Sequence, residues 1–180
     1  ASITGLAAET YTVTITDANG CSVTETVIIT DPVVLAVSIV IDANVTCNGL
    51  SNGGATASAT GGTGVYTYAW STSTSSATFA TTASITGLAA ETYTVTITDA
   101  NGCSDTETVI ITEPAVLAAS TSIDLSVTCN GLSNGGATAS ATGGTGAYTF
   151  AWSTSTSSVT FATTASITGL AAATYTVTIT

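Results

Sequence analysis

Four cysteines carry the most distinctive chemistry in this chain: Cys21, Cys47, Cys103 and Cys129. They recur in two contexts, "NGCS" and "VTCNG", at alternating intervals of 26 and 56 residues. Metal sites built from thiolates need short cysteine pairs or cysteine together with histidine, and the chain contains no histidine. The spacing therefore disfavours a metal site and leaves disulfide bonds or free buried thiols.

The absence of basic residues argues against two classes of binding partner. Lys, Arg and His are absent, and eleven Asp and Glu residues give a formal net charge of −11. Nucleic acids are held mainly by Lys and Arg, so we predict no nucleic-acid binding. The same deficit argues against electrostatic attraction to anionic lipid.

Few side chains remain that could catalyse a reaction. General acid–base chemistry near neutral pH relies most often on histidine, and Ser or Cys nucleophiles usually need a neighbouring base. Carboxylates alone are left, and a glycosidase-like pair also needs a shaped sugar pocket that no motif here indicates. We therefore predict that the chain is not an enzyme.

The apolar residues are too dispersed for a membrane segment. They make up 44% of the chain, but no run reaches the roughly 18 apolar residues of a membrane span. The longest tract, "PVVLAVSIVI" at 32–41, predicts a buried strand. The chain begins at Ala without a visible signal peptide, which suggests a fragment or a processed piece.

An internal repeat dictates the organisation of the chain. "ASITGLAA" begins at Ala1, Ala83 and Ala165, so the repeat length is 82 residues. Such a unit exceeds the roughly 20 to 50 residues of solenoid repeats and is long enough to be a small domain. Pro32 and Pro114 follow the last strand-like run of a unit, where proline commonly marks a strand edge or a linker.

These prolines predict the domain boundaries. Residues 1–31 would be the C-terminal part of one β-sandwich repeat, 32–113 a complete repeat, and 114–180 the N-terminal and central part of the next.

Within one unit the residue pattern is typical of strands. "TYTVTIT" at 10–16 places Tyr, Val and Ile on one face and Thr on the other. "DANG" follows, and an Asn-Gly pair between two such runs predicts a hairpin because both residues tolerate positive φ. Among the shorter runs, Phe79 and Ile85 are the expected inward anchors. Seven or so short strands per unit predict an all-β chain of tandem immunoglobulin-like antiparallel β-sandwich domains.

Two segments of each unit resemble a known family. "VTCNGLSNGGATASATGGTGVYTYAWS" at 45–71 and "GLAAETYTVTITDANGCS" at 87–104 resemble the SprB-type repeat of gliding-motility and other giant surface adhesins of Bacteroidota. The second segment is also similar to the end of PKD and related immunoglobulin-like modules. The resemblance implies an extracellular, cell-surface adhesin or filament stalk, exported by the type IX route, with no catalytic residues.

An extracellular location makes disulfides the preferred role for the cysteines. A Cys47–Cys103 bond would close one domain, and entropy arguments give it about 4 kcal/mol. The alternative bonds Cys21–Cys47 and Cys103–Cys129 would join neighbouring domains. In an immunoglobulin topology the two cysteine contexts lie at opposite poles, which disfavours both schemes and would permit a bond to another domain or chain.

Five aromatic residues are predicted to serve the core. Trp70 and Trp152 lie on a predicted central strand, where a sandwich uses tryptophan as a core plug. Tyr11, Tyr93 and Tyr175 lie early in the strand before "DANG", where a tyrosine hydroxyl can bond a corner of the backbone. A platform for stacking sugars is the alternative.

Other polar features predict possible ligands. The Thr row of 10–16 could bind ice or carry glycans, although it fits the solvated face of a strand. Asn44 begins an Asn-x-Thr sequon, but Ser126 takes its place in the next repeat. No cofactor is expected. Asp17, Asn19, Asp31, Asp42 and their repeats could supply oxygen ligands for Ca²⁺ at the domain joints. This is a minor alternative, because they are not spaced as an EF-hand loop and Asp17 and Asn19 already have a role in the turn.

These observations favour a structural role. We predict a repeat module of an extracellular adhesin stalk or filament that provides length and stiffness without turnover. The expected partners are neighbouring identical repeats, other copies of the chain in a fibre, and surface glycans. The alternative is a glycan- or ice-binding module that acts through repeated Thr-rich faces.

Overall fold

The computed structural model describes residues 2–180, and Ala1, the first residue of the predicted 1–31 segment, lies outside them. Throughout residues 2–180 the chain forms β-strands joined by turns and bends, which confirms the all-β prediction. No helix within that range is long and apolar enough to cross a membrane. The strands are β1 (Glu9–Thr16), β2 (Ser22–Ile29), β3 (Ala36–Ala43), β4 (Gly53–Thr60), β5 (Thr67–Thr72), β6 (Ser75–Ala80), β7 (Ser84–Leu88), β8 (Glu91–Thr98), β9 (Ser104–Ile111), β10 (Ala118–Leu125), β11 (Gly135–Thr142), β12 (Phe150–Thr154), β13 (Ser157–Ala162), β14 (Ser166–Leu170) and β15 (Tyr175–Ile179).

The first segment forms a two-stranded antiparallel hairpin. Strands β1 and β2 pair from Glu9 opposite Ile29 to Thr16 opposite Ser22. The predicted turn is present, but its geometry differs from the expectation, because Gly20 has a φ of 89° and no residue other than glycine has positive φ in the described chain. The Gly20 N–H donates to Asp17 O at 3.1 Å, as in a type I turn closed by a left-handed glycine.

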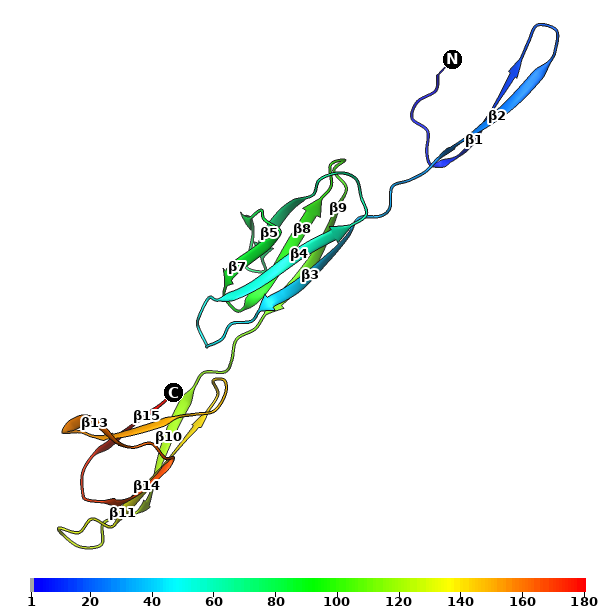
Figure 1. Ribbon diagram of the computed structural model, residues 1–180. Helices are drawn as coiled ribbons and strands as arrows, with labels where there is room; N and C mark the ends of the chain where they lie inside the picture. The colour runs from blue at the N-terminus through cyan, green and yellow to red at the C-terminus, as the bar shows by residue number, and fades with distance from the viewer. Residues whose placement is uncertain (1) are drawn as a thin grey trace. The chain divides into compact units, whose positions relative to one another are not determined.

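The middle repeat (32–113) contains two antiparallel sheets. One has the strand order β3-β4-β7 and the other β6-β5-β8-β9 (Figure 1). The alternating pattern of β8 holds, because Tyr93, Val95 and Ile97 are buried. The other buried apolar residues of this repeat are Leu35, Val45, Ala55, Ala57, Trp70, Ile85, Leu88, Val109 and Ile111.

Two sequence expectations about the middle repeat are wrong. The tract 32–41 does not form a buried strand, because β3 begins only at Ala36 and lies at a sheet edge with Val40 and Ile41 exposed. Phe79 is not an inward anchor, since 49% of it is exposed on the edge strand β6, whereas Ile85 is buried as expected. Both errors arise at edges, where hydrophobic composition alone does not indicate how much of a strand is covered.

The third repeat (114–180) forms the sheets β10-β11-β14 and β13-β12-β15. Its buried cluster consists of Ala139, Trp152, Ile167 and Leu170. Strand β15 is an edge strand, paired with β12 from Tyr175 opposite Thr154 to Ile179 opposite Phe150. Within residues 2–180, each sheet is built from strands of one predicted repeat.

Candidate functional site

The tryptophans are buried as core residues. Trp70 on β5 is fully buried, and its indole Nε1–H donates to Thr82 O at 2.9 Å. Trp152 on β12 repeats this arrangement, with a 2.9 Å bond to Thr164 O. A buried indole with a satisfied N–H has no free ring face for a sugar, so the geometry favours core packing over a stacking platform.

The three tyrosines form the same backbone contact in each repeat. The hydroxyl of Tyr11 donates to Ala7 O at 3.1 Å, that of Tyr93 to Ala89 O at 3.2 Å, and that of Tyr175 to Ala171 O at 3.1 Å. Burial is the largest of the effects that raise the pKa of Tyr93, and the charge of Glu91 adds to it. Each ring therefore fastens the loop before its own strand.

Asp99 organises the turn between β8 and β9. It is buried, and its carboxylate accepts the backbone N–H groups of Thr63, Asn101 and Cys103, each at 2.9 Å. The Thr63 N–H is the largest of the contacts that hold the pKa of Asp99 below its ordinary value, and they outweigh desolvation. From the sequence, we predicted only a turn role for Asp17, the counterpart of Asp99 in the preceding repeat. The bond between Asp99 and the distant Thr63 was not predicted.

The four cysteines lie at the surface of the chain. All four thiols are exposed, and none of them forms a disulfide in the described chain, so they are not buried free thiols either. Cys103 directly precedes β9, whereas Cys47 follows Val45, whose N–H donates to Thr112 O just beyond the other end of β9.

The length of β9 separates the two thiols of the middle repeat. An eight-residue strand spans roughly 26 Å, and a disulfide needs Cα atoms within about 7 Å. This strand length argues against the preferred Cys47–Cys103 pairing, which stays a prediction. The alternatives Cys21–Cys47 and Cys103–Cys129 join different repeats and stay predictions.

Asn44 has a structural contact. Its Oδ1 accepts the N–H of Thr112 at 2.9 Å, and the side chain is exposed. A glycan would be joined to the other amide atom, Nδ2, so this contact does not occupy the attachment point.

The carboxylates do not assemble a metal centre. Among residues 2–180, no group of three or more Cys, Asp or Glu side chains could hold a metal ion. Asp42 accepts the Thr56 hydroxyl at 2.8 Å, and Asp17 accepts the N–H groups of Asn19 and Cys21.

The "CNG" turn has a partner that sequence reasoning missed. Asn48 Nδ2 donates to Glu113 Oε1 at 2.9 Å and to Pro114 O at 3.2 Å, and Gly49 N–H donates to Glu113 Oε2 at 2.6 Å. These bonds fasten the linker residues to the turn that contains Cys47. The recurring acid before each linker proline, in "TDP" and "TEP", was the available signal.

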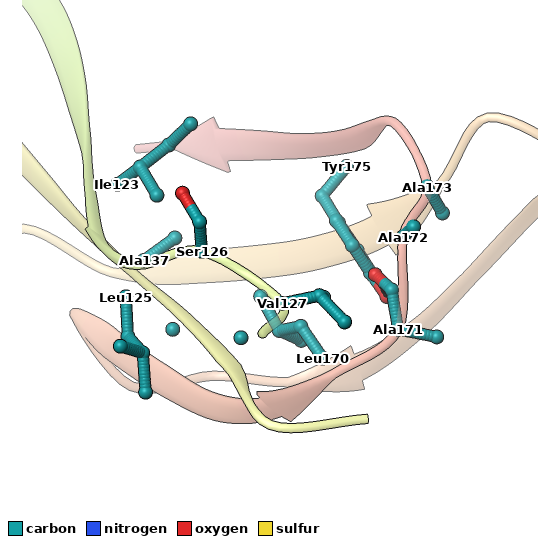
Figure 2. Close-up of a pocket in the computed structure, with 12 residues that line it drawn as sticks. Ile123, Leu125, Ser126, Val127, Ala137, Leu170, Ala171, Ala172, Ala173 and Tyr175 are labelled. Atoms are coloured by element: carbon teal, nitrogen blue, oxygen red, sulfur yellow. Dashed lines mark hydrogen bonds between the residues drawn. The ribbon is translucent and has the colours of Figure 1, made fainter. Parts of the chain in front are cut away.

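The third repeat contains an open hollow of about 420 Å³ (Figure 2). Leu125, Leu170 and Tyr175 lie around it, together with Val127 and Gly135. Its lining is mostly apolar and includes no carboxylate. The hollow can accept an aliphatic side chain, but it lacks the paired acids of a glycosidase.

Comparison with known proteins identifies one family in two places. The profile of the SprB repeat matches residues 41–75 and 125–157, which confirms the resemblance at those segments. These matches cover β4 and β5 of the middle repeat and β11 and β12 of the third repeat. No curated protein matches the chain.

Among solved structures, the chain is similar to the three N-terminal domains of the bacteriophage RB49 Highly Immunogenic Outer Capsid protein (Hoc). The two are 20% identical with a TM-score of 0.46. The match covers 80% of this chain and 54% of that one, so the chain spans about half of that structure's length.

Proposed function

We propose that this chain is a section of an extracellular adhesin stalk or filament, in which repeats provide length and stiffness and no reaction is catalysed. The SprB matches support this proposal, because such repeats are associated with cell-surface adhesins. The 82-residue repeat and the absence of Lys, Arg and His agree with it. Export by the type IX route is part of the proposal.

The observation that carries the proposal is the joint at Pro114. On one side, Glu113 is held by the Asn48 amide and the Gly49 N–H. On the other side, Gly144 N–H donates to Ala115 O at 2.8 Å. Pro114 lies between these anchors, its φ is fixed by its ring, and its carbonyl accepts Asn48 Nδ2.

The second anchor depends on glycine. Gly143 has a φ of 76°, and an added Cβ would lie 2.0 Å from Val116 O. This second anchor recurs at the preceding joint, since Gly62 N–H donates to Val33 O at 2.7 Å and a Cβ on Gly61 would lie 2.0 Å from Val34 O. The Pro114 joint has both flanks hydrogen-bonded and no flexible Gly/Ser spacer, so we expect it to be stiff, as a stalk requires.

The proposal is tested by measuring the spread of distances across one joint. Spin labels on exposed positions of the middle and third repeats should give a narrow distance distribution by double electron–electron resonance. Glu113→Ala removes two anchoring bonds and should broaden it, whereas Glu107→Ala on β9 removes the same charge away from the joint and should not. A wild-type distribution as broad as that of Glu113→Ala would contradict the stalk proposal.

The Thr-rich face supports a second candidate, binding of glycans or ice. The Thr residues of β1 are exposed, and the hydroxyls of Thr14 and Thr24 lie 3.4 Å apart on neighbouring strands. This alternative predicts saturable binding on a glycan array or thermal hysteresis in freezing solutions. Replacing Thr12 and Thr14 by Ala should abolish either effect, and a stalk without ligands should show neither.

A glycan on the stalk is part of the same proposal. Asn44 is exposed and begins a sequon, so glycosylation there would add mass to the middle repeat but not at Ser126 of the third. Mass spectrometry of the native chain distinguishes the two repeats directly.

A further inference from the structure

The Asn-Gly pairs of the middle repeat are held in different ways. They are Asn48-Gly49, Asn52-Gly53 and Asn101-Gly102. Asparagine is chemically labile, and a glycine after it offers the least steric hindrance when its backbone nitrogen attacks the side-chain amide. The surroundings of each pair therefore decide whether it reacts.

The pair Asn52-Gly53 is fixed on both sides. Asn52 Oδ1 accepts Thr46 N–H at 3.1 Å, and Asn52 Nδ2 donates to Thr46 Oγ1 at 2.6 Å. Gly53 is buried at the start of β4, where it lies opposite Leu88 of β7. The amide carbon and the glycine nitrogen cannot approach each other unless these contacts open, so the fold protects this pair.

The pair Asn48-Gly49 is held by one carboxylate. Asn48 Nδ2 donates to Glu113 Oε1 at 2.9 Å, and Gly49 N–H donates to Glu113 Oε2 at 2.6 Å. The attacking nitrogen must lose its proton, and a neighbouring negative charge opposes that step. Glu113 therefore restrains the amide and the nucleophile together.

The pair Asn101-Gly102 lies in the exposed turn between β8 and β9. Asn101 N–H donates to Asp99 Oδ1 at 2.9 Å, and Gly102 N–H donates to Asp99 O at 3.1 Å. Within residues 2–180, the side-chain amide of Asn101 has no hydrogen-bond partner. This amide is therefore able to turn toward the Gly102 nitrogen, which only the turn holds in place.

We propose that Asn101 is a site of spontaneous deamidation, which alters the turn that Asp99 organises. The Gly102 nitrogen attacks Asn101 Cγ, a new C–N bond forms, the bond from Cγ to Nδ2 breaks, and ammonia leaves with the proton of the Gly102 N–H. Water then opens the cyclic imide at either carbonyl and leaves aspartate or isoaspartate. The net reaction exchanges ammonia for water, so it needs no oxidant, cofactor or enzyme.

Both products disturb the contacts of Asp99. Each places a new carboxylate near that of Asp99, and isoaspartate also adds a methylene group to the main chain. The N–H groups of Asn101 and Cys103 donate to the same Asp99 oxygen at 2.9 Å, one on each side of the modified bond. Like charge and a longer chain weaken both bonds. Because Asp99 also accepts the Thr63 N–H, the modification reaches the loop that binds the linker before β3.

Peptide mapping measures the rates in one sample. The complete chain is incubated in mildly alkaline buffer made with heavy-oxygen water, so that only new deamidation is labelled. After unfolding, chymotrypsin cuts at aromatic residues and leucine, and Leu50 separates Asn48 from Asn52. Asn101 should react at least about tenfold faster than Asn52, because the contacts of Asn52-Gly53 must open before its imide forms. In urea the rates should converge, since the fold no longer distinguishes the pairs.

Two glutamate variants test the protection of Asn48. Glu113→Ala should raise the rate at Asn48 several-fold, whereas Glu107→Ala on β9 should not change it. The rate at Asn52 reports on folding in both variants and should stay at the wild-type value. An unchanged or lower rate at Asn48 in Glu113→Ala would show that hydrogen bonding does not control the reaction, and the proposal would fail.

The turn itself is tested by its own substitution and by its product. Asn101→Gln should abolish labelling of the turn peptide, because glutamine cyclises far more slowly. The deamidated wild-type fraction, separated by anion exchange, should have a lower urea midpoint in the middle repeat than the unmodified fraction. An Asn101 rate no faster than that of Asn52 in the folded chain, or an unchanged midpoint after modification, overturns the proposal.

Discussion

The middle and third repeats contain nearly the same strands, but they bury them to different extents. Tyr93, Val95 and Ile97 of β8 are fully covered, whereas their counterparts Tyr175, Val177 and Ile179 are half-buried. The inward direction of these residues is the same in both repeats, because it follows from strand alternation. In the middle repeat, β9 contributes the buried residues Val109 and Ile111 to the core that covers these side chains.

The strongest test of the role of β9 is to truncate the equivalent isoleucine in β9 and in β2. Ile111→Ala should destabilise the middle repeat by about 2–5 kcal/mol, because it empties a filled site. Ile29→Ala in β2 should change the stability of a dilute chain by less than about 0.5 kcal/mol, because Ile29 is partly exposed there. Hydrogen exchange read by mass spectrometry, repeat by repeat, measures both, and equal effects would contradict the role assigned to β9.

A smaller effect is expected at the glycine under that isoleucine. A Cβ on Gly53 would lie 2.7 Å from Ile111 Cγ2 and 3.0 Å from Leu88 O, so Gly53→Ala should cost about 1–3 kcal/mol. A Cβ on Gly135 would meet Leu170 O at 3.0 Å and Leu125 O at 3.4 Å. Gly135→Ala should therefore cost less than Gly53→Ala in the same exchange experiment, and the reverse order would show that the Ile111 contact does not determine the cost at Gly53.

We expect acid to lower the stability of the middle repeat through Asp99, in the turn before β9. The pKa of Asp99 is lowered in the folded chain, so its stabilising effect is complete above its unfolded pKa near 4. That effect is lost as pH falls through the lower folded pKa, because the protonated carboxyl no longer favours the three N–H donors. Asp99→Asn should lower the urea midpoint of the middle repeat at pH 7 and flatten its dependence on pH below 4.

Asp17→Asn is the matched control for that substitution. Asp17 accepts the N–H groups of Asn19 and Cys21 in the hairpin, and Asp99 has the additional Thr63 contacts. The control should leave the urea midpoint of the middle repeat unchanged, because Asp17 lies outside that repeat, and an equal shift would show that the effect does not come from the contacts of Asp99.

The smallest change in stability is expected from substitution of a cysteine. All four thiols are exposed, so every thiol that is not held in a disulfide should react with a thiol reagent in the native, air-exposed monomer. Cys47→Ser should change the stability of the middle repeat by less than about 0.5 kcal/mol. A titre of two thiols in a monomer would instead establish an intrachain bond, and non-reducing mass spectrometry would identify the pair.

Local patterns were sufficient to predict most of the strands. Alternation placed Tyr93, Val95 and Ile97 inward, and the same reasoning indicated the core role of Trp70 and Trp152. The Asn-Gly turn was predicted at the correct position, but only the glycine takes positive φ, because Asp17 supplies the side-chain bonds that shape the turn. Neighbouring residues in the sequence were thus informative where the contacts themselves are local.

The remaining features depend on contacts between distant residues. Glu113 and Asn48 are separated by 65 residues, and Thr63 and Asp99 by 36, so no local pattern reveals either bond. Phe79 is as apolar as a core residue, but it lies on an edge strand. The cysteine pairing stays a prediction for the same reason, since spacing along the chain does not indicate which end of β9 each thiol approaches.

The fastening of β9 at both ends has a mechanical consequence. Asp105 near its start accepts Val37 N–H, and Thr112 just past its end accepts Val45 N–H, so β9 and β3 run in the same direction. A pulling force on residues 32 and 113 acts along both strands and perpendicular to the hydrogen bonds of their ladders. We expect the repeat to resist tension by shear, in which many bonds must yield together, rather than to open like a zipper.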